Sequence, residues 1–113
     1  MKKYSLTREK RLRRNTQIRK ALSAGKSVRD GILTIYMAKN DCGFSRLGVS
    51  VSKSCGSAVK RNKLKRLVRE VFRQNQYDIP ESRDYLILIR KKIDQPSFEL
   101  IKDSFLRLII QIK

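Results

Sequence analysis

Residues 57–73 read SAVKRNKLKRLVREVFR, and the interpretation of the whole chain starts from this stretch. At 100° per residue, its apolar side chains follow the i, i+3, i+4, i+7, i+8 spacing of one helix face. These side chains are Leu64, Leu67, Val68, Val71 and Phe72. The opposite face carries Asn62, Lys65, Arg66, Arg69 and Arg73. The pattern predicts an amphipathic helix with one face in a core and a cationic face outside.

The charge on this helix is unbalanced. From Lys53 to Gln74 the chain has eight basic residues and a single acid, Glu70. Exposed helix faces usually mix the two signs, because opposite charges one turn apart stabilise a helix and like charges do not. An ordinary solvated face is the alternative, but the imbalance favours a polyanionic partner. Arginine, which dominates the row, suits bidentate contact with phosphate.

Composition agrees with this interpretation. The 113 residues predict a single domain, 1–113, and 40% apolar residues are enough for a globular core. A net charge of +18 favours nucleic acid or an anionic membrane surface as the partner. No apolar run is long enough to span a bilayer and no signal peptide is evident, so we expect a cytoplasmic protein.

The residues that usually carry catalysis or bind metals are scarce. There is no histidine, and the two cysteines, Cys42 and Cys55, lack zinc-site spacing. A disulfide is not expected in a cytosolic chain. Without histidine the usual general base is missing, and the acids form no spaced pair. We therefore predict no catalytic residue and no metal ligand in the polypeptide itself.

The other elements follow from pattern and turn residues. Segment 1–14 carries seven basic residues and one acid, and is predicted to be a partly mobile basic arm. A short helix is predicted from an Asn15 cap to Gly25, with Ile18, Ala21 and Leu22 facing inward. Segments 28–38, 46–52 and 85–89 are predicted strands, with an extra short strand near 27–29, and 85–89 is expected to be buried on both faces. Pro96 and Ser97 introduce a final helix whose apolar stripe faces the core.

The strand at 46–52 alternates strictly. Leu47, Val49 and Val51 belong to a core, whereas Gly48, Ser50 and Ser52 form a face of very small side chains. Such a face allows a ligand to approach the sheet closely, although an ordinary solvated face is the alternative.

The segment GSAVKRNKLKRLVREVFR, preceded by SRLGVSVSKS, resembles the signature region of the protein subunit of bacterial ribonuclease P. The resemblance covers nearly the whole chain, including YLILIRK at 85–91 and the C-terminal helix. It implies an α+β fold, an α/β sandwich of αβββαβα order with a central sheet. It also implies a left-handed βαβ crossover, against the general right-handed rule.

The resemblance further implies a function. The protein would bind the catalytic RNA subunit and the 5′ leader of precursor tRNA, while the RNA subunit performs the hydrolysis that removes the leader. Mg²⁺ would be held mainly by RNA and substrate phosphates, and the polypeptide would require no cofactor. The implied partners are the RNA subunit and precursor tRNA, with no membrane and no obligatory protein partner.

Two groups of site residues carry over from the resemblance. The residues implied to bind the RNA subunit are Arg61, Asn62, Lys63, Lys65, Arg66 and Arg69. The residues implied to form a cleft for the leader are Ile18, Leu22, Thr34, Tyr36, Gly48, Ser50, Lys53, Ala58 and Asn62. Lys63 stands where the family motif has an arginine, and Ile18 and Leu22 stand where the family often has phenylalanine.

Three other classes remain as alternatives. A ribosomal or other structured-RNA-binding protein would share the size and charge. A helix-turn-helix DNA-binding protein would need a helix where 47–52 reads as strand. A membrane-surface helix would leave the 113-residue chain without its best core stripe.

Overall fold

The computed structural model describes residues 10–11, 15–23 and 26–112. The helices are α1 (Asn15–Ser23), α2 (Ala58–Asn75) and α3 (Phe98–Ile112), with a short 3-10 helix, η2 (Lys53–Cys55), before α2. The strands are β1 (Lys26–Arg29), β2 (Thr34–Lys39), β3 (Arg46–Val51) and β4 (Arg83–Ile89). The predicted order αβββαβα is confirmed.

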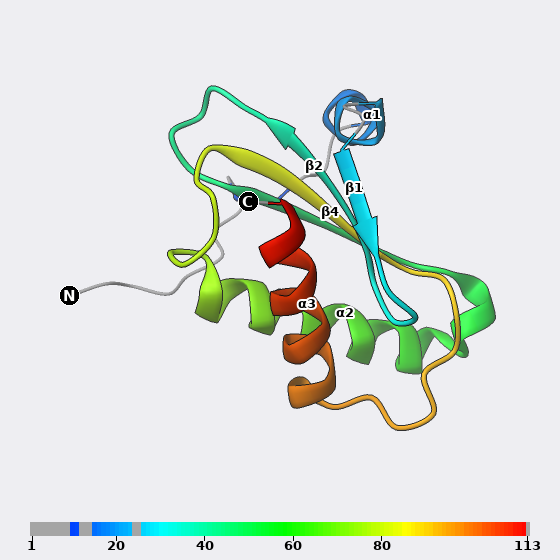
Figure 1. The fold of residues 1–113 in the computed structure, drawn as a ribbon. Coiled ribbons are helices and arrows are strands. Elements are labelled where there is room, and N and C mark those ends of the chain that lie inside the picture. Colours follow the sequence, from blue (N-terminus) through cyan, green and yellow to red (C-terminus); the bar gives the residue numbers. More distant parts are fainter. Residues whose placement is uncertain (1–9, 12–14, 24–25, 113) are drawn as a thin grey trace.

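The four strands form one mixed sheet in the order β1-β2-β4-β3. β1 pairs antiparallel with β2, β2 antiparallel with β4, and β3 parallel with β4. Helices α2 and α3 cover one face and α1 packs on the other, as Figure 1 shows. The fold is therefore α+β, with α2 connecting two adjacent parallel strands. The left-handedness of this crossover stays a prediction of the resemblance.

The core lies between the sheet and the α2/α3 layer. Every second residue of the strands points into it, including Ile35, Met37, Leu47, Tyr85 and Ile87, all buried. The helices supply the facing residues Leu64, Val68, Val71, Phe72, Ile101, Phe105, Leu108 and Ile109. The apolar stripes predicted for α2 and α3 are thus confirmed.

One strand prediction needs correction. The chain does not run as a single strand through 28–38, but turns after Arg29 and returns as β2. The carboxylate of Asp30 causes this turn: Oδ1 accepts hydrogen bonds from the backbone N–H of Ile32 at 2.7 Å and of Leu33 at 2.9 Å. The extra short strand expected near 27–29 is β1.

The N-terminal predictions are only partly covered. Most of the arm 1–14, and Gly25 at the end of the first helix, lie outside the described residues. Lys10 and Arg11 are described, and both contact the fold. Lys10 Nζ donates to Gln76 Oε1 at 3.2 Å, and Arg11 forms an isolated parallel bridge with Leu47 on β3. The mobility of the arm stays a prediction.

Candidate nucleic-acid interface

The start of α2 is fixed by local hydrogen bonds. The hydroxyl of Ser57 accepts from the backbone N–H of Lys60 at 3.3 Å and caps the helix. Gly56, just before it, has φ of 133°, and a Cβ there would lie 3.1 Å from Lys60 Cδ. Glycine therefore allows the tight passage from η2 into α2. This passage sets the first turns of α2 directly after the end of β3.

The polar face of α2 is an open row of side chains. Ala58, Asn62 and Arg66 are exposed, and Lys65 and Arg69 are half-buried along the same face. At 1.5 Å rise per residue, the row from Ala58 to Arg69 spans about 16 Å. The structure thus brings four of the six predicted RNA-subunit residues, Asn62, Lys65, Arg66 and Arg69, onto one surface, here called the α2 basic face.

Lys63 lies apart from this face. It lines a different hollow, of about 180 Å³, together with Lys60, Lys92 and Asp94. The reason is angular, since Lys63 lies 100° beyond Asn62 and turns toward the loop between β4 and α3. The motif at 61–63 therefore presents its basic side chains on different sides of the helix.

The charges on the α2 basic face are poorly compensated. Burial, together with the nearby positive charge of Arg11, lowers the pKa of Arg69. The Nε of Arg61 is buried without a hydrogen-bond partner in the described structure. An unsatisfied donor and crowded like charges both cost stability in the free protein. A polyanion on the exposed side chains would relieve the repulsion between the like charges.

Arg73 is the exception on this helix. Its guanidinium donates to Glu70, with Nε to Oε2 at 3.0 Å, and Gln74 Nε2 donates to the same carboxylate at 2.9 Å. These hydrogen bonds lower the pKa of Glu70 from 4.5 to about 2. Arg73 is thus largely neutralised, and the sequence pattern that placed it in the free row did not account for this pairing.

The small-residue face of β3 lies on the α1 side of the sheet. In the register of the three strands, Thr34 on β2 and Ser50 on β3 flank Leu88 on β4. Ser50 is exposed, and Thr34 and Leu88 are half-buried, so this row is an open floor. The next row is Tyr36, Leu86 and Gly48, of which Leu86 and Gly48 are buried. The predicted cleft is therefore open at the Thr34–Ser50 row and largely closed at Gly48.

Helix α1 forms one wall above this floor. Ala21 is 0% exposed and holds α1 on the sheet, and Ile18 is half-buried. Leu22 is 43% exposed, which corrects the prediction that it faces inward. Its position on a nine-residue helix that packs through Ala21 leaves it at the open side. An exposed leucine in this place suits a groove wall better than a core.

The remaining predicted cleft residues lie beyond the end of β3. Lys53 is exposed at the start of η2, and Ala58 and Asn62 are exposed on the first turns of α2. Together with Ile18, Leu22 and the Thr34–Ser50 floor they form the set here called the groove.

Two hollows on this side bring in residues that the sequence did not suggest. One, of about 350 Å³, is lined by Ser50, Ser52, Leu88, Ile89 and Arg90. The other, of about 270 Å³, is lined by Arg29, Asp30, Gly31, Ile32, Thr34, Arg90 and Lys91. Arg90 lines both hollows, so it places a cation next to the Thr34–Ser50 floor. Side chains of β4 alternate between the two faces of the sheet, but YLILI is apolar throughout, so its sequence does not show which residues face the groove. Leu88 is half-exposed, so the expectation that 85–89 is buried on both faces is wrong at this residue.

The described residues contain no candidate metal-binding site. Nowhere in residues 10–11, 15–23 and 26–112 do three histidine, cysteine or acidic side chains gather at ligand distance. Both cysteines are free thiols, Cys42 exposed and Cys55 buried with its Sγ 3.5 Å from the Ile89 carbonyl oxygen. In the same ranges, no helix is long and apolar enough to cross a membrane.

Comparison with known proteins identifies the family. The family model for ribonuclease P matches residues 6–113. The ribonuclease P protein component of Thermotoga maritima is 35% identical over 113 residues, covering 96% of this chain and 97% of that one. The corresponding protein of Clostridium botulinum is 34% identical over 103 residues, covering 90% and 93%.

Solved structures agree. The Staphylococcus aureus RNase P protein superposes with a TM-score of 0.83 at 30% identity, covering 92% of this chain and 95% of that one. The T. maritima RNase P protein, solved in complex with 1-(4-fluorophenyl)-2-thiourea, gives 0.82 at 34% identity, covering 90% and 99%. The sequence match over nearly the full length, the shared fold and the α2 basic face lead to one conclusion: the chain belongs to the ribonuclease P protein family, the RNA-binding protein components of a tRNA-processing ribonucleoprotein.

Proposed function

We propose that this protein binds the RNA subunit of ribonuclease P through the α2 basic face and holds the 5′ leader of precursor tRNA in the groove. The observation that carries the proposal is the adjacency of two unlike surfaces. One surface is the row of poorly compensated cations on α2. The other is the open Thr34–Ser50 row on the sheet, which includes β3, the strand that precedes α2 in the chain. Membership of the family favours this function over the ribosomal, duplex-DNA and membrane-surface alternatives.

The α2 basic face suits a folded RNA backbone. Phosphates that replace condensed counterions would give affinity with a strong salt dependence. Arg66 and Arg69 offer planar forks for bidentate phosphate contact, and Lys65 offers a point charge. Asn62, exposed at the junction with the groove, adds a neutral donor and acceptor.

The groove suits an extended single strand. The hydroxyls of Thr34 and Ser50 can bond sugar or base edges, and the small side chain of Ser50 lets the chain approach the sheet closely. Lys53 and Arg90 place cations at its border for leader phosphates. Ile18 and Leu22 offer apolar contact to bases from the α1 side. Holding the leader would reduce the orientational freedom of the scissile bond, which is a positional contribution to the rate.

We assign the hydrolysis to the RNA subunit. In the described residues no three histidine, cysteine or acidic side chains gather into a group, and in this proposal the polypeptide's part is to bind and position. Mg²⁺ would be coordinated mainly by RNA and substrate phosphates, since it keeps several waters and needs few protein ligands.

The proposal is tested by reconstitution with a bacterial ribonuclease P RNA. The protein should raise the affinity for precursor tRNA much more than for mature tRNA, and Ser50→Trp, which fills the floor, should remove this preference while leaving RNA-subunit binding intact. Gln111→Trp, at an exposed position near the end of α3, is the control. Equal affinity for both tRNAs with the wild-type protein, or cleavage by the polypeptide without RNA, would contradict the proposal.

A further inference from the structure

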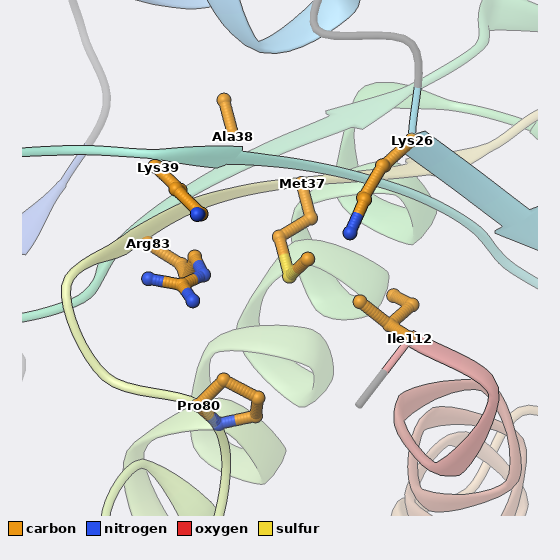
Figure 2. A pocket seen from close by; sticks show the side chains of 7 residues that line it. All are labelled: Lys26, Met37, Ala38, Lys39, Pro80, Arg83 and Ile112. Atoms are coloured by element: carbon orange, nitrogen blue, oxygen red, sulfur yellow. The ribbon is translucent and has the colours of Figure 1, made fainter.

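A hollow of about 390 Å³ lies on the other side of the sheet from the groove, beside the C-terminal end of α3. It is lined by Lys26, Met37, Ala38, Lys39, Pro80, Arg83 and Ile112, as Figure 2 shows. Its volume is within the range of small-molecule sites, about 300–1,000 Å³. None of these seven residues belongs to the α2 basic face or to the groove.

Strand register brings three cations to this corner. Lys26 on β1 is opposite Met37 on β2, and Lys39 on β2 is opposite Arg83 on β4. Since side chains alternate along a strand, Met37 and Lys39 point to the same face. In Figure 2 Lys39 and Arg83 lie on one side of the Met37 side chain and Lys26 lies on the other, with Pro80 and Ile112 across the hollow from them. None of these seven lining residues is acidic.

Arg83 is held in place by its own chain. Its Nη1 donates to the carbonyl oxygens of Glu81 at 3.1 Å and Ser82 at 3.4 Å. Its Nε is buried and has no hydrogen-bond partner in the described part of the chain. Three cations without an acid among the lining residues repel one another and raise the free energy of the empty hollow. An anion would lower it.

The rest of the lining is apolar. The thioether of Met37, the ring of Pro80 and the side chain of Ile112 face the same space. Methionine sulfur makes favourable contacts with aromatic rings. We propose that the hollow binds a nucleotide 5′-phosphate, with the phosphate between Lys26, Lys39 and Arg83 and the base or sugar over Met37, Pro80 and Ile112. The nucleotide would be either free or the 5′-phosphorylated end of an RNA.

Titration of the full-length ¹⁵N-labelled protein with uridine 5′-monophosphate, followed by NMR, tests the proposal. Amide shifts are expected at Lys26, Ala38 and Arg83, with weaker shifts at the same positions for inorganic phosphate and none for uridine. Lys26→Gln/Lys39→Gln should weaken binding about tenfold or more, because both lysines are exposed and their loss removes two charged contacts. Lys20→Gln/Lys102→Gln removes the same charge outside the hollow and should leave binding unchanged.

Two results would overturn the proposal: shifts confined to groove residues such as Thr34 and Ser50, or an equal loss in both double variants, which would indicate attraction by net charge alone. A pentaribonucleotide with and without a 5′-phosphate separates the two sources. Phosphate-dependent shifts at Ala38 would identify an RNA end, and shifts with the mononucleotide alone would identify a free nucleotide. The Lys26→Gln/Lys39→Gln protein should retain leader preference, so this test is independent of the proposed function.

Discussion

Arg46 and Arg69 are both partly buried arginines, but their surroundings are opposite. Arg46 makes a two-pronged contact with Asp84, Nε to Oδ1 and Nη2 to Oδ2, each at 2.7 Å, and Asn40 donates to the same carboxylate at 2.7 Å. The hydrogen bonds of Arg46 to Asp84 raise the pKa of Arg46. Burial and the charge of Arg11 lower the pKa of Arg69 instead. Arg46 is paired with an acid within the fold, whereas no ion pair of Arg69 is present among the described residues.

The comparison separates stability from binding in a very basic chain. The Arg46–Asp84 cluster joins the start of β3 to β4 and to the turn after β2, so these charged groups stabilise the sheet. The α2 basic face keeps its charge at some cost to the free protein. We therefore expect substitutions in the first cluster to change folding, and substitutions in the second to change RNA affinity.

The largest expected effect is on the free energy of unfolding, from substitution in the Arg46–Asp84 cluster. Asp84→Ala leaves the Arg46 guanidinium with a 15% exposed side chain and no carboxylate, and should cost about 3–5 kcal/mol in the free energy of unfolding. Urea denaturation measures this cost, with exposed Asp103→Ala as the control. Arg46→Met/Asp84→Leu, which removes both charges, should recover most of the loss. A loss below about 1 kcal/mol for Asp84→Ala would show that the pair is not a structural element.

The next largest expected effect is on RNA affinity, from substitution in the α2 basic face. Arg66→Ala/Arg69→Ala should leave the free energy of unfolding unchanged or slightly higher, because like charges are removed. Affinity for the RNA subunit should fall about 10- to 100-fold, and the slope of log K against log salt should become shallower by about 1.4–1.8. Filter binding over a range of salt concentrations measures both. Lys102→Ala/Arg107→Ala on α3 removes equal charge elsewhere, and the same change of slope in that variant would argue against a specific face.

The sequence predicted the parts of these regions that depend on periodicity. The stripe of α2 and the alternation of β3 are local patterns, and both appear in the structure. The turn at Asp30 was missed although the sequence carries a signal for it: the polar run Arg29-Asp30-Gly31 contains an Asp-Gly pair, which is typical of hairpin turns. Arg90 was missed because its place beside Thr34 and Ser50 depends on strand register. The pairing of Arg46 with Asp84 joins residues 38 positions apart, which no local pattern reports.

The groove can be sharpened by adding the aromatic side chain that the family often has. Leu22 is 43% exposed, so Leu22→Phe should fold normally and present a ring toward the groove. Stacking on one base is worth about 1–3 kcal/mol, so affinity for precursor tRNA should rise about fivefold or more, with no change for mature tRNA. Competition binding with the reconstituted complex measures this. Ile110→Phe, exposed on α3, is the matched control; an equal gain there, or none at Leu22, would place the leader elsewhere.

The smallest effect is expected from removing the carboxylate that pairs with Arg73. Glu70→Gln removes the carboxylate that holds Arg73, so the α2 basic face gains a cation, and the slope of log K against log salt should steepen by up to about 0.7–0.9.

The same substitution has an effect on stability that depends on pH. Because the pKa of Glu70 in the folded protein is lowered to about 2, its stabilising effect is complete above its ordinary pKa of 4.5 and disappears as pH falls through 2. The side chain is 41% exposed, so solvent screening keeps the stability difference small. Thermal unfolding of both proteins should therefore differ slightly at pH 7 and coincide below pH 2. An unchanged salt slope would mean that Arg73 lies beyond the reach of the RNA, which would place the end of the α2 basic face at Arg69.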